Sequence, residues 1–112
     1  GYSEAWLHHK GRNKHHPEYW VDDIAPDKTP IIPYKYAAEM ICDKMAAGMA
    51  YEKEKFSEQY ELDYWNKEKQ YEKINSKTEQ FVTAILEQAV EEGINKTFTK
   101  ANFRKNYEKY CK

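Results

Sequence analysis

The apolar residues between positions 77 and 92 constrain the fold most, because they recur at the spacing of an α-helix. The stripe consists of Phe81, Val82, Ile85, Leu86, Ala89 and Val90. Residues three and four positions apart share one face of a helix, so this segment must bury that face against other elements. Ser76 followed by Glu79 predicts a capping box at its start, and Gly93 predicts its end. We interpret this helix as core and not as a cofactor site.

The composition favours more helices of the same kind. The chain has 112 residues, of which 33% are charged and 15% aromatic, with only four Gly and four Pro. A chain of this length supports one modest hydrophobic core. Abundant Lys and Glu with few helix breakers are typical of helices with solvated outer faces. We therefore predict a single all-α domain of four to five helices over residues 1–112.

Local signals place the other elements. The expected helices span residues 3–10, 33–50, 58–72 and 100–110. Pro33 suits the first position of its helix, and Ser57 and Thr99 are expected N-caps. Residues 21–32 contain several Asp and Pro residues, so we expect an extended loop across the surface.

Charge and motifs exclude several functions. The net charge of -1, from 18 basic and 19 acidic residues, offers no basic surplus for a nucleic acid. The chain has no run of about 20 apolar residues that would cross a membrane. Cys42 and Cys111 lack a metal-type spacing, so we expect two reduced thiols in a cytoplasmic protein. Because the chain begins at Gly1 without methionine, we expect it to be a fragment.

All the histidines of the chain fall in one short stretch, as two adjacent pairs. They are His8, His9, His15 and His16. Pro17 disfavours a helical conformation at His16, so the second pair is expected at a corner between a loop and a helix. Imidazole titrates near neutral pH and is a frequent metal ligand, which makes this stretch a candidate metal or acid–base site. The alternative is a structural corner in which the imidazoles bridge backbone groups.

Asp43 is the carboxylate we expect to complete such a site. At helical spacing it shares a side with Tyr36, Glu39, Met40, Ala46, Ala47 and Ala50. A carboxylate turned inward among small and apolar residues must be paired, hydrogen-bonded or bound to a metal. One histidine of each pair could therefore converge with Asp43 on a divalent ion such as Mn, Fe, Ni or Zn. Glu39 is a candidate acceptor that would orient a histidine ring.

Three segments of the chain resemble a family of small bacterial and phage proteins of unknown function. The segments are Ala5-Trp6-Leu7-His8-His9, then Arg12-Asn13-Lys14-His15-His16-Pro17-Glu18-Tyr19-Trp20, then Glu39-Met40-Ile41-Cys42-Asp43 with Ala46-Ala47-Gly48. The resemblance covers roughly residues 2–86. Some members are labelled catalase, but neither a haem pocket nor a haem ligand can be assigned here.

Members of that family carry a His-Asp-x-Ser-Lys segment upstream of the point where this chain starts. His-Asp followed by further histidines and a late helical Asp is similar to the ligand order of HD-domain metal-dependent phosphohydrolases. The resemblance implies that His9, His15, His16 and Asp43 match the metal ligands of those enzymes. Our leading prediction is therefore a metal-dependent hydrolase of the HD-like type, which acts on a phosphate ester of a small molecule and uses His8 and Glu39 as catalytic residues. No His-Asp dipeptide occurs in these 112 residues, so this chain would hold only part of such a site.

The alternative function is a non-enzymatic helical interaction module. The His cluster would then be structural, and the tyrosine-rich middle helix would be the partner surface. Tyr60, Tyr64 and Trp65 are expected to pack inward, whereas a contiguous exposed patch of the three would favour this alternative. A homo-oligomer is compatible with either function.

Overall fold

The computed structural model describes residues 29–112. Its α-helices are α2 (Tyr34–Glu52), α3 (Glu58–Glu68), α4 (Ser76–Glu92), α5 (Ile94–Thr97) and α6 (Lys100–Cys111). Single 3₁₀ turns, Lys53–Lys55 and Lys69–Tyr71, follow α2 and α3. The described part contains no strand, and the predicted all-α class is confirmed. The expected helix over residues 3–10 and all four histidines lie outside the described residues.

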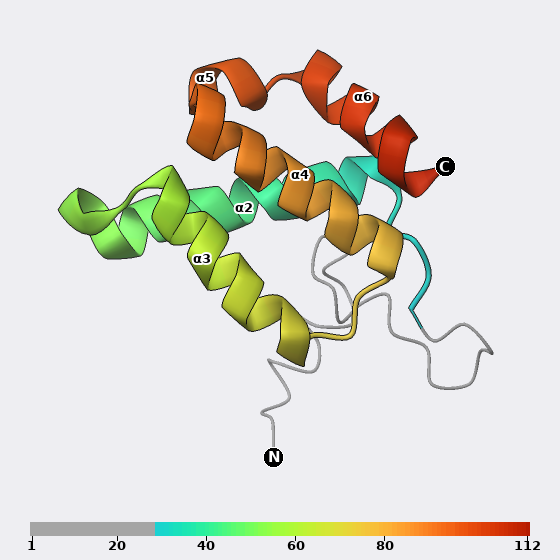
Figure 1. Ribbon diagram of the computed structural model, residues 1–112, viewed down its shortest axis with the longest axis horizontal. Helices are drawn as coiled ribbons and strands as arrows, with labels where there is room; N and C mark the ends of the chain where they lie inside the picture. The colour runs from blue at the N-terminus through green and yellow to red at the C-terminus, as the bar shows by residue number, and fades with distance from the viewer. Residues whose placement is uncertain (1–28) are drawn as a thin grey trace.

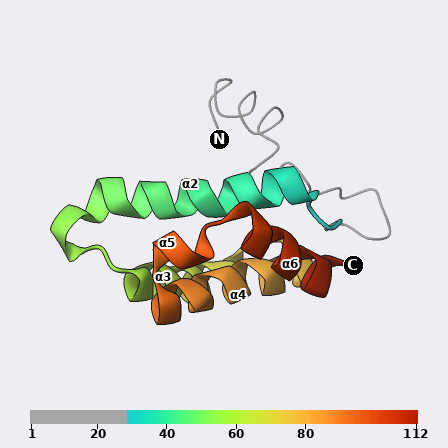
Figure 2. The same cartoon turned by 90° about the horizontal axis from the view of Figure 1, so that it is seen from above.

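The amphipathic helix α4 lies at the centre of the fold. It runs between α3 and α6, and α2 forms a second layer across them (Figures 1 and 2). Its apolar stripe is buried as predicted, with the exception of Val90. The buried members are Phe81, Val82, Ile85, Leu86 and Ala89. Because neighbours cover α4 on several sides, its apolar side chains form the middle of the core.

Helix α2 buries a different face from the one predicted. Its buried residues are Ala37, Met40, Ile41 and Met45. The expectation that Asp43 faces inward is therefore wrong. Asp43 is exposed, and so are the alanines expected on its side of the helix, Ala46, Ala47 and Ala50. Burying Met and Ile removes more apolar area from water than burying Ala, so the longer side chains determine which face turns to the core.

The segment before α2 is tied into the core, which corrects the expectation of a surface loop for this part. Ile32 is fully buried. Its backbone N–H donates to Oγ1 of Thr78 at 3.2 Å, and its carbonyl accepts from the hydroxyl of Tyr107 at 2.9 Å. These bonds join the entry of α2 to α4 and α6, and they satisfy backbone groups that water cannot reach.

Most predicted helix ends are confirmed. The hydroxyls of Ser57 and Thr99 accept the backbone N–H groups of Tyr60 and Asn102, as N-caps do. Gly93 ends α4 with a φ of 87°, a conformation that suits glycine.

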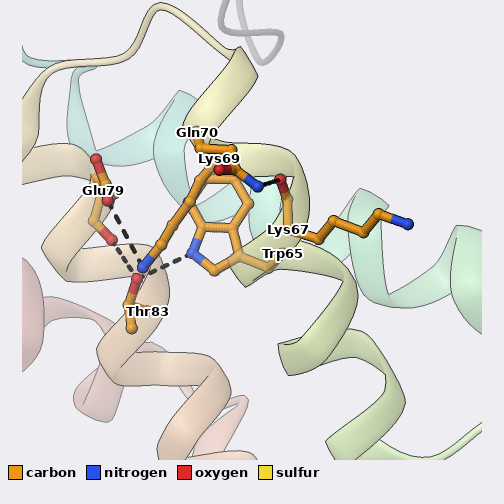
Figure 3. Close-up of polar contacts among 6 residues, drawn as sticks. All are labelled: Trp65, Lys67, Lys69, Gln70, Glu79 and Thr83. Carbon is orange, nitrogen blue, oxygen red and sulfur yellow. Dashed lines mark hydrogen bonds and ion pairs between the residues drawn. The ribbon is translucent and has the colours of Figure 1, made fainter.

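The start of α4 differs by one residue from the prediction. Asn75, and not Ser76, caps the helix, since its side chain accepts from the backbone N–H of Lys77 at 2.8 Å. Asn75 also donates to the carbonyl of Thr29 at 2.8 Å, a contact that Ser76 does not make. The side chain of Glu79 forms an ion pair with Lys69 at 3.6 Å in place of the capping-box bond (Figure 3).

Trp65 fixes α3 against α4. Its side chain is 1% exposed, and its indole N–H donates to Oγ1 of Thr83 at 2.9 Å. The Thr83 hydroxyl in turn donates to the carbonyl of Glu79 at 2.8 Å, as Figure 3 shows. The expectation that Tyr60 and Tyr64 also pack inward is wrong, because Tyr60 is half-buried and Tyr64 is 52% exposed. One face of α3 therefore holds the helix in place, and its tyrosines remain accessible.

Candidate functional site

A groove of about 430 Å³ lies between α2 and α3. Helix α2 lines it with Lys44, Ala47, Gly48, Tyr51 and Glu52. Helix α3 lines it with Tyr60, Glu61, Tyr64, Trp65 and Glu68. The groove therefore combines aromatic rings with carboxylates and one ammonium group. Its volume falls within the roughly 300–1,000 Å³ typical of ligand sites.

Gly48 gives the groove its depth. A Cβ placed on this residue would lie 2.5 Å from Oε2 of Glu61 and 3.0 Å from the ring of Phe56. Carbon atoms do not approach so closely, so any larger residue would displace the carboxylate. Glycine at this point lets a side chain of α3 reach the backbone of α2, at a cost of about 0.5–1 kcal/mol relative to alanine in a helix interior.

Glu61 is the unusual group of this groove. Its side chain is only 4% exposed. Burial raises the pKa of its carboxyl above the ordinary 4.5; the charge of Lys44 opposes this effect, and that of Glu68 adds to it. Within residues 29–112, no hydrogen bond or ion pair reaches the Glu61 oxygens. The residue as a whole is buried, while its oxygens keep some contact with solvent at the groove surface. A carboxylate with so little hydration and no such partner is rare.

Lys44 is held by other groups. Its ammonium bonds to Oε1 of Glu68 at 2.9 Å and lies 5.0 Å from the centre of the Trp65 ring. Burial alone would raise the pKa of Glu68, but hydrogen bonding to Glu72 and to Lys44 outweighs burial and lowers it. Glu68 is thus an ionised carboxylate whose charge is balanced by Lys44 in direct contact. Glu61 feels the charge of Lys44 but forms no ion pair with it.

Tyrosines form the rim above Glu61. The rings of Tyr60 and Tyr64 are stacked, with centroids 6.5 Å apart and planes inclined by 15°. The hydroxyl of Tyr60 donates to Oε1 of Glu52 at 2.8 Å, and this bond raises the pKa of the phenol. Tyr51 across the groove is 84% exposed. The rim therefore offers accessible ring faces next to a buried negative group.

A second groove holds two of the residues predicted from the sequence. It has a volume of about 320 Å³ and lies between α2 and the region around Phe98 and Phe103. Glu39 and Asp43 both line it, one helical turn apart. Among residues 29–112, no group of three His, Cys, Asp or Glu side chains is placed to hold a metal ion. The predicted ligands His9, His15 and His16, and the predicted catalytic His8, lie outside the described residues.

The cysteines are both free thiols. Cys42 is exposed beside the second groove, and its pKa is raised by partial burial and by the charges of Asp43 and Glu39. Burial raises the pKa of Cys111 to about 11. Neither side chain is a thiolate at neutral pH, so neither is an activated nucleophile.

The sequence analysis missed Glu61, although a signal for it was present. Glu61 precedes the predicted inward residue Trp65 by four positions, so the two share a face of α3. A carboxylate one turn from a buried tryptophan is expected to be at least partly buried.

Comparison with known proteins assigns the family. A model described as a family of unknown function (DUF5662) matches residues 1–88, so the chain belongs to that family. The match agrees with the resemblance expected over roughly residues 2–86, and it provides no link to HD-domain phosphohydrolases or to catalase. All residues that line the groove between α2 and α3 fall inside the matched range. No curated protein and no solved structure matches the chain.

Within the described residues, no helix is long and apolar enough to cross a bilayer.

The raised pKa of Glu61 predicts a stability effect. An acid whose pKa rises on folding binds its proton more tightly in the folded state, so stability falls as the pH rises from 4.5 through the folded pKa. Glu61→Gln should therefore raise the Tm at pH 7, and the difference from wild type should disappear below pH 4.5. Thermal unfolding followed by circular dichroism across this pH range measures both effects.

Glu87→Gln is the matched control, because Glu87 is exposed on α4. Its Tm should stay close to that of the wild type at every pH. A lower Tm for Glu61→Gln at pH 7 would show that the carboxylate makes a stabilising contact and would contradict this assignment.

Proposed function

We propose that this DUF5662 protein is a non-enzymatic helical interaction module that binds another protein at the groove between α2 and α3. The observation that carries the proposal is the tyrosine rim of Tyr51, Tyr60 and Tyr64 around a buried carboxylate. Tyrosine is enriched at protein interfaces because its ring buries a large area and its hydroxyl remains hydrated. Trp65 packs inward as predicted, at 1% exposed, so the accessible patch consists of tyrosines without the tryptophan.

The phenols and the ammonium group of this groove suit recognition better than reaction. The phenols of Tyr60 and Tyr64 have raised pKa values, so both remain neutral near pH 7. The ammonium of Lys44 is held by Glu68 and Trp65. Catalytic acids and bases usually have pKa values close to the working pH, which these phenols do not have.

Removing the rim should weaken binding. A random 12-residue peptide library displayed on phage, selected against the wild-type protein, provides the probe. We expect Tyr64→Ala and Tyr51→Ala to weaken the selected peptide at least about tenfold, since tyrosine hot spots contribute more than about 1.4 kcal/mol. Fluorescence anisotropy with the labelled peptide measures the Kd.

Tyr71→Ala is the control, because Tyr71 is equally accessible, at 80% exposed, but does not line the groove. It should bind as the wild type does. If all three variants bind alike, or if selection yields no peptide, the groove is not the interaction surface.

The second candidate is a metal-dependent hydrolase of the HD-like type, acting on a phosphate ester. The observation that favours it is the placement of Glu39 and Asp43 one turn apart along the second groove. We propose that His9, His15, His16 and Asp43 would bind Mn, Fe, Ni or Zn, a ligand set suited to these metals. The ion would lower the pKa of a bound water, His8 would protonate the leaving group, and Glu39 would orient a histidine.

Metal content tests this second candidate. Protein incubated with Mn, Fe, Ni or Zn and then desalted should retain one equivalent of one of them by mass spectrometry. Asp43→Ala should lose the metal without unfolding, because Asp43 is exposed. Asp63→Ala, an exposed aspartate on α3, should retain it. Equal metal content in both variants, or none in the wild type, would reject the site.

A further inference from the structure

We propose that the groove between α2 and α3 takes a basic side chain, arginine or lysine, from a peptide segment of the partner protein, with its cationic group at Glu61. This inference rests on the proposed function and specifies its ligand. It is carried by the one carboxylate of the groove that is buried and has no hydrogen-bonding or ionic partner in the described residues.

The charges of the groove are unbalanced at one point. Glu52, Glu61 and Glu68 face one cation, Lys44. Glu68 is neutralised by Lys44 at 2.9 Å, and Glu52 accepts the hydroxyl of Tyr60 at 2.8 Å. Of the three, Glu61 alone has no hydrogen bond or ion pair within the described residues, and its side chain is largely buried. A guanidinium or ammonium group would replace the lost hydration with charge-assisted hydrogen bonds.

The aromatic rings of the groove can contact the apolar stem of a basic side chain. The same groove already holds a cation against a ring and a carboxylate, since Lys44 lies over Trp65 and contacts Glu68. The stacked faces of Tyr60 and Tyr64 offer a comparable surface beside Glu61. Arginine and lysine bury an apolar stem along such rings while their charged end meets a carboxylate.

The length of the groove fits a peptide segment. Lys44 and Glu52, at the two ends of its lining on α2, are eight positions apart. This is about 12 Å along a helix at 1.5 Å per residue. An extended peptide rises about 3.3 Å per residue, so three to four residues fit along the groove. The exposed rings of Tyr51 and Tyr64 would contact the residues that flank the basic one.

Gly48 determines where the Glu61 carboxylate lies in the groove. Oε2 of Glu61 lies only 2.5 Å from the position that a Cβ on this residue would take. Gly48→Ala should therefore displace the carboxylate from its seat while leaving every charge of the groove in place. This variant separates the position of the negative charge from its presence.

The experiment uses acetylated and amidated nine-residue peptide pools with mixed Tyr, Leu and Ala at the flanking positions. The central residue is Arg, Lys, citrulline or norleucine. Citrulline is the neutral counterpart of arginine, and norleucine is that of lysine. Anisotropy measurements on the wild type should give at least about tenfold tighter binding of the Arg and Lys pools, as expected for hydrogen bonds between charged groups. In Glu61→Gln this preference should vanish, and in Gly48→Ala it should shrink.

Glu87→Gln serves as the control and should keep the full preference, since it removes an exposed carboxylate outside the groove. Circular dichroism melts should show all variants folded. If the wild type binds all four pools equally and Tyr64→Ala weakens them, the groove binds partners but the basic anchor is wrong. Binding of no pool would reject both this inference and the proposed function. Free N-acetyl-arginine amide binding as tightly as the peptides would identify a small cation as the ligand and overturn the peptide occupant.

Discussion

The burial of α4 is the constraint on which the rest of the described structure depends. Its neighbours contact it at defined points, among them Trp65 of α3 at Thr83, Phe103 of α6 at Phe81, and Ile32 before α2 at Thr78. Helix α3 is therefore held by a buried indole on one side. Glu61 lies one turn before Trp65 on the same face of α3, so the contact that fixes the helix also presents Glu61 toward α2, with the tyrosines beside it. The groove follows from how the core is assembled.

Two features that weaken folding meet at one point of this groove. A glycine inside α2 lowers helix stability, and the buried carboxylate of Glu61 loses hydration without a bond in return. A sequence optimised only for stability would place alanine and an apolar residue here. Violations of local stability rules concentrate where a protein binds or reacts. Their coincidence across two helices is the physical basis for assigning recognition to this groove.

The helices and most of their ends could be predicted because periodicity and capping are local. Ser57, Thr99 and Gly93 act as expected, and Asn75 replaces Ser76 since it also reaches Thr29. The buried face of α2 was mispredicted because the spacing of the alanines around Asp43 is as regular as that of Met40, Ile41 and Met45. The larger apolar area of the longer side chains, and not the spacing, indicates the buried face. The groove depends on how two helices pack, which no single segment encodes. The metal ligands among His8 to His16 stay a prediction, as they lie outside the described residues.

The most direct test of the account is the titration of the Glu61 carboxyl, followed by carbon-13 NMR of glutamate-labelled protein and assigned by comparison with Glu61→Gln. The facing charges are Lys44 and Glu52 from α2 and Glu68 from α3. We expect a pKa above the ordinary 4.5 in the free protein. We also expect that pKa to fall when the arginine-centred peptide pool is added, and to stay unchanged with the citrulline pool. A pKa at or below 4.5 in the free protein would contradict the claim that this carboxylate lacks a compensating cationic partner.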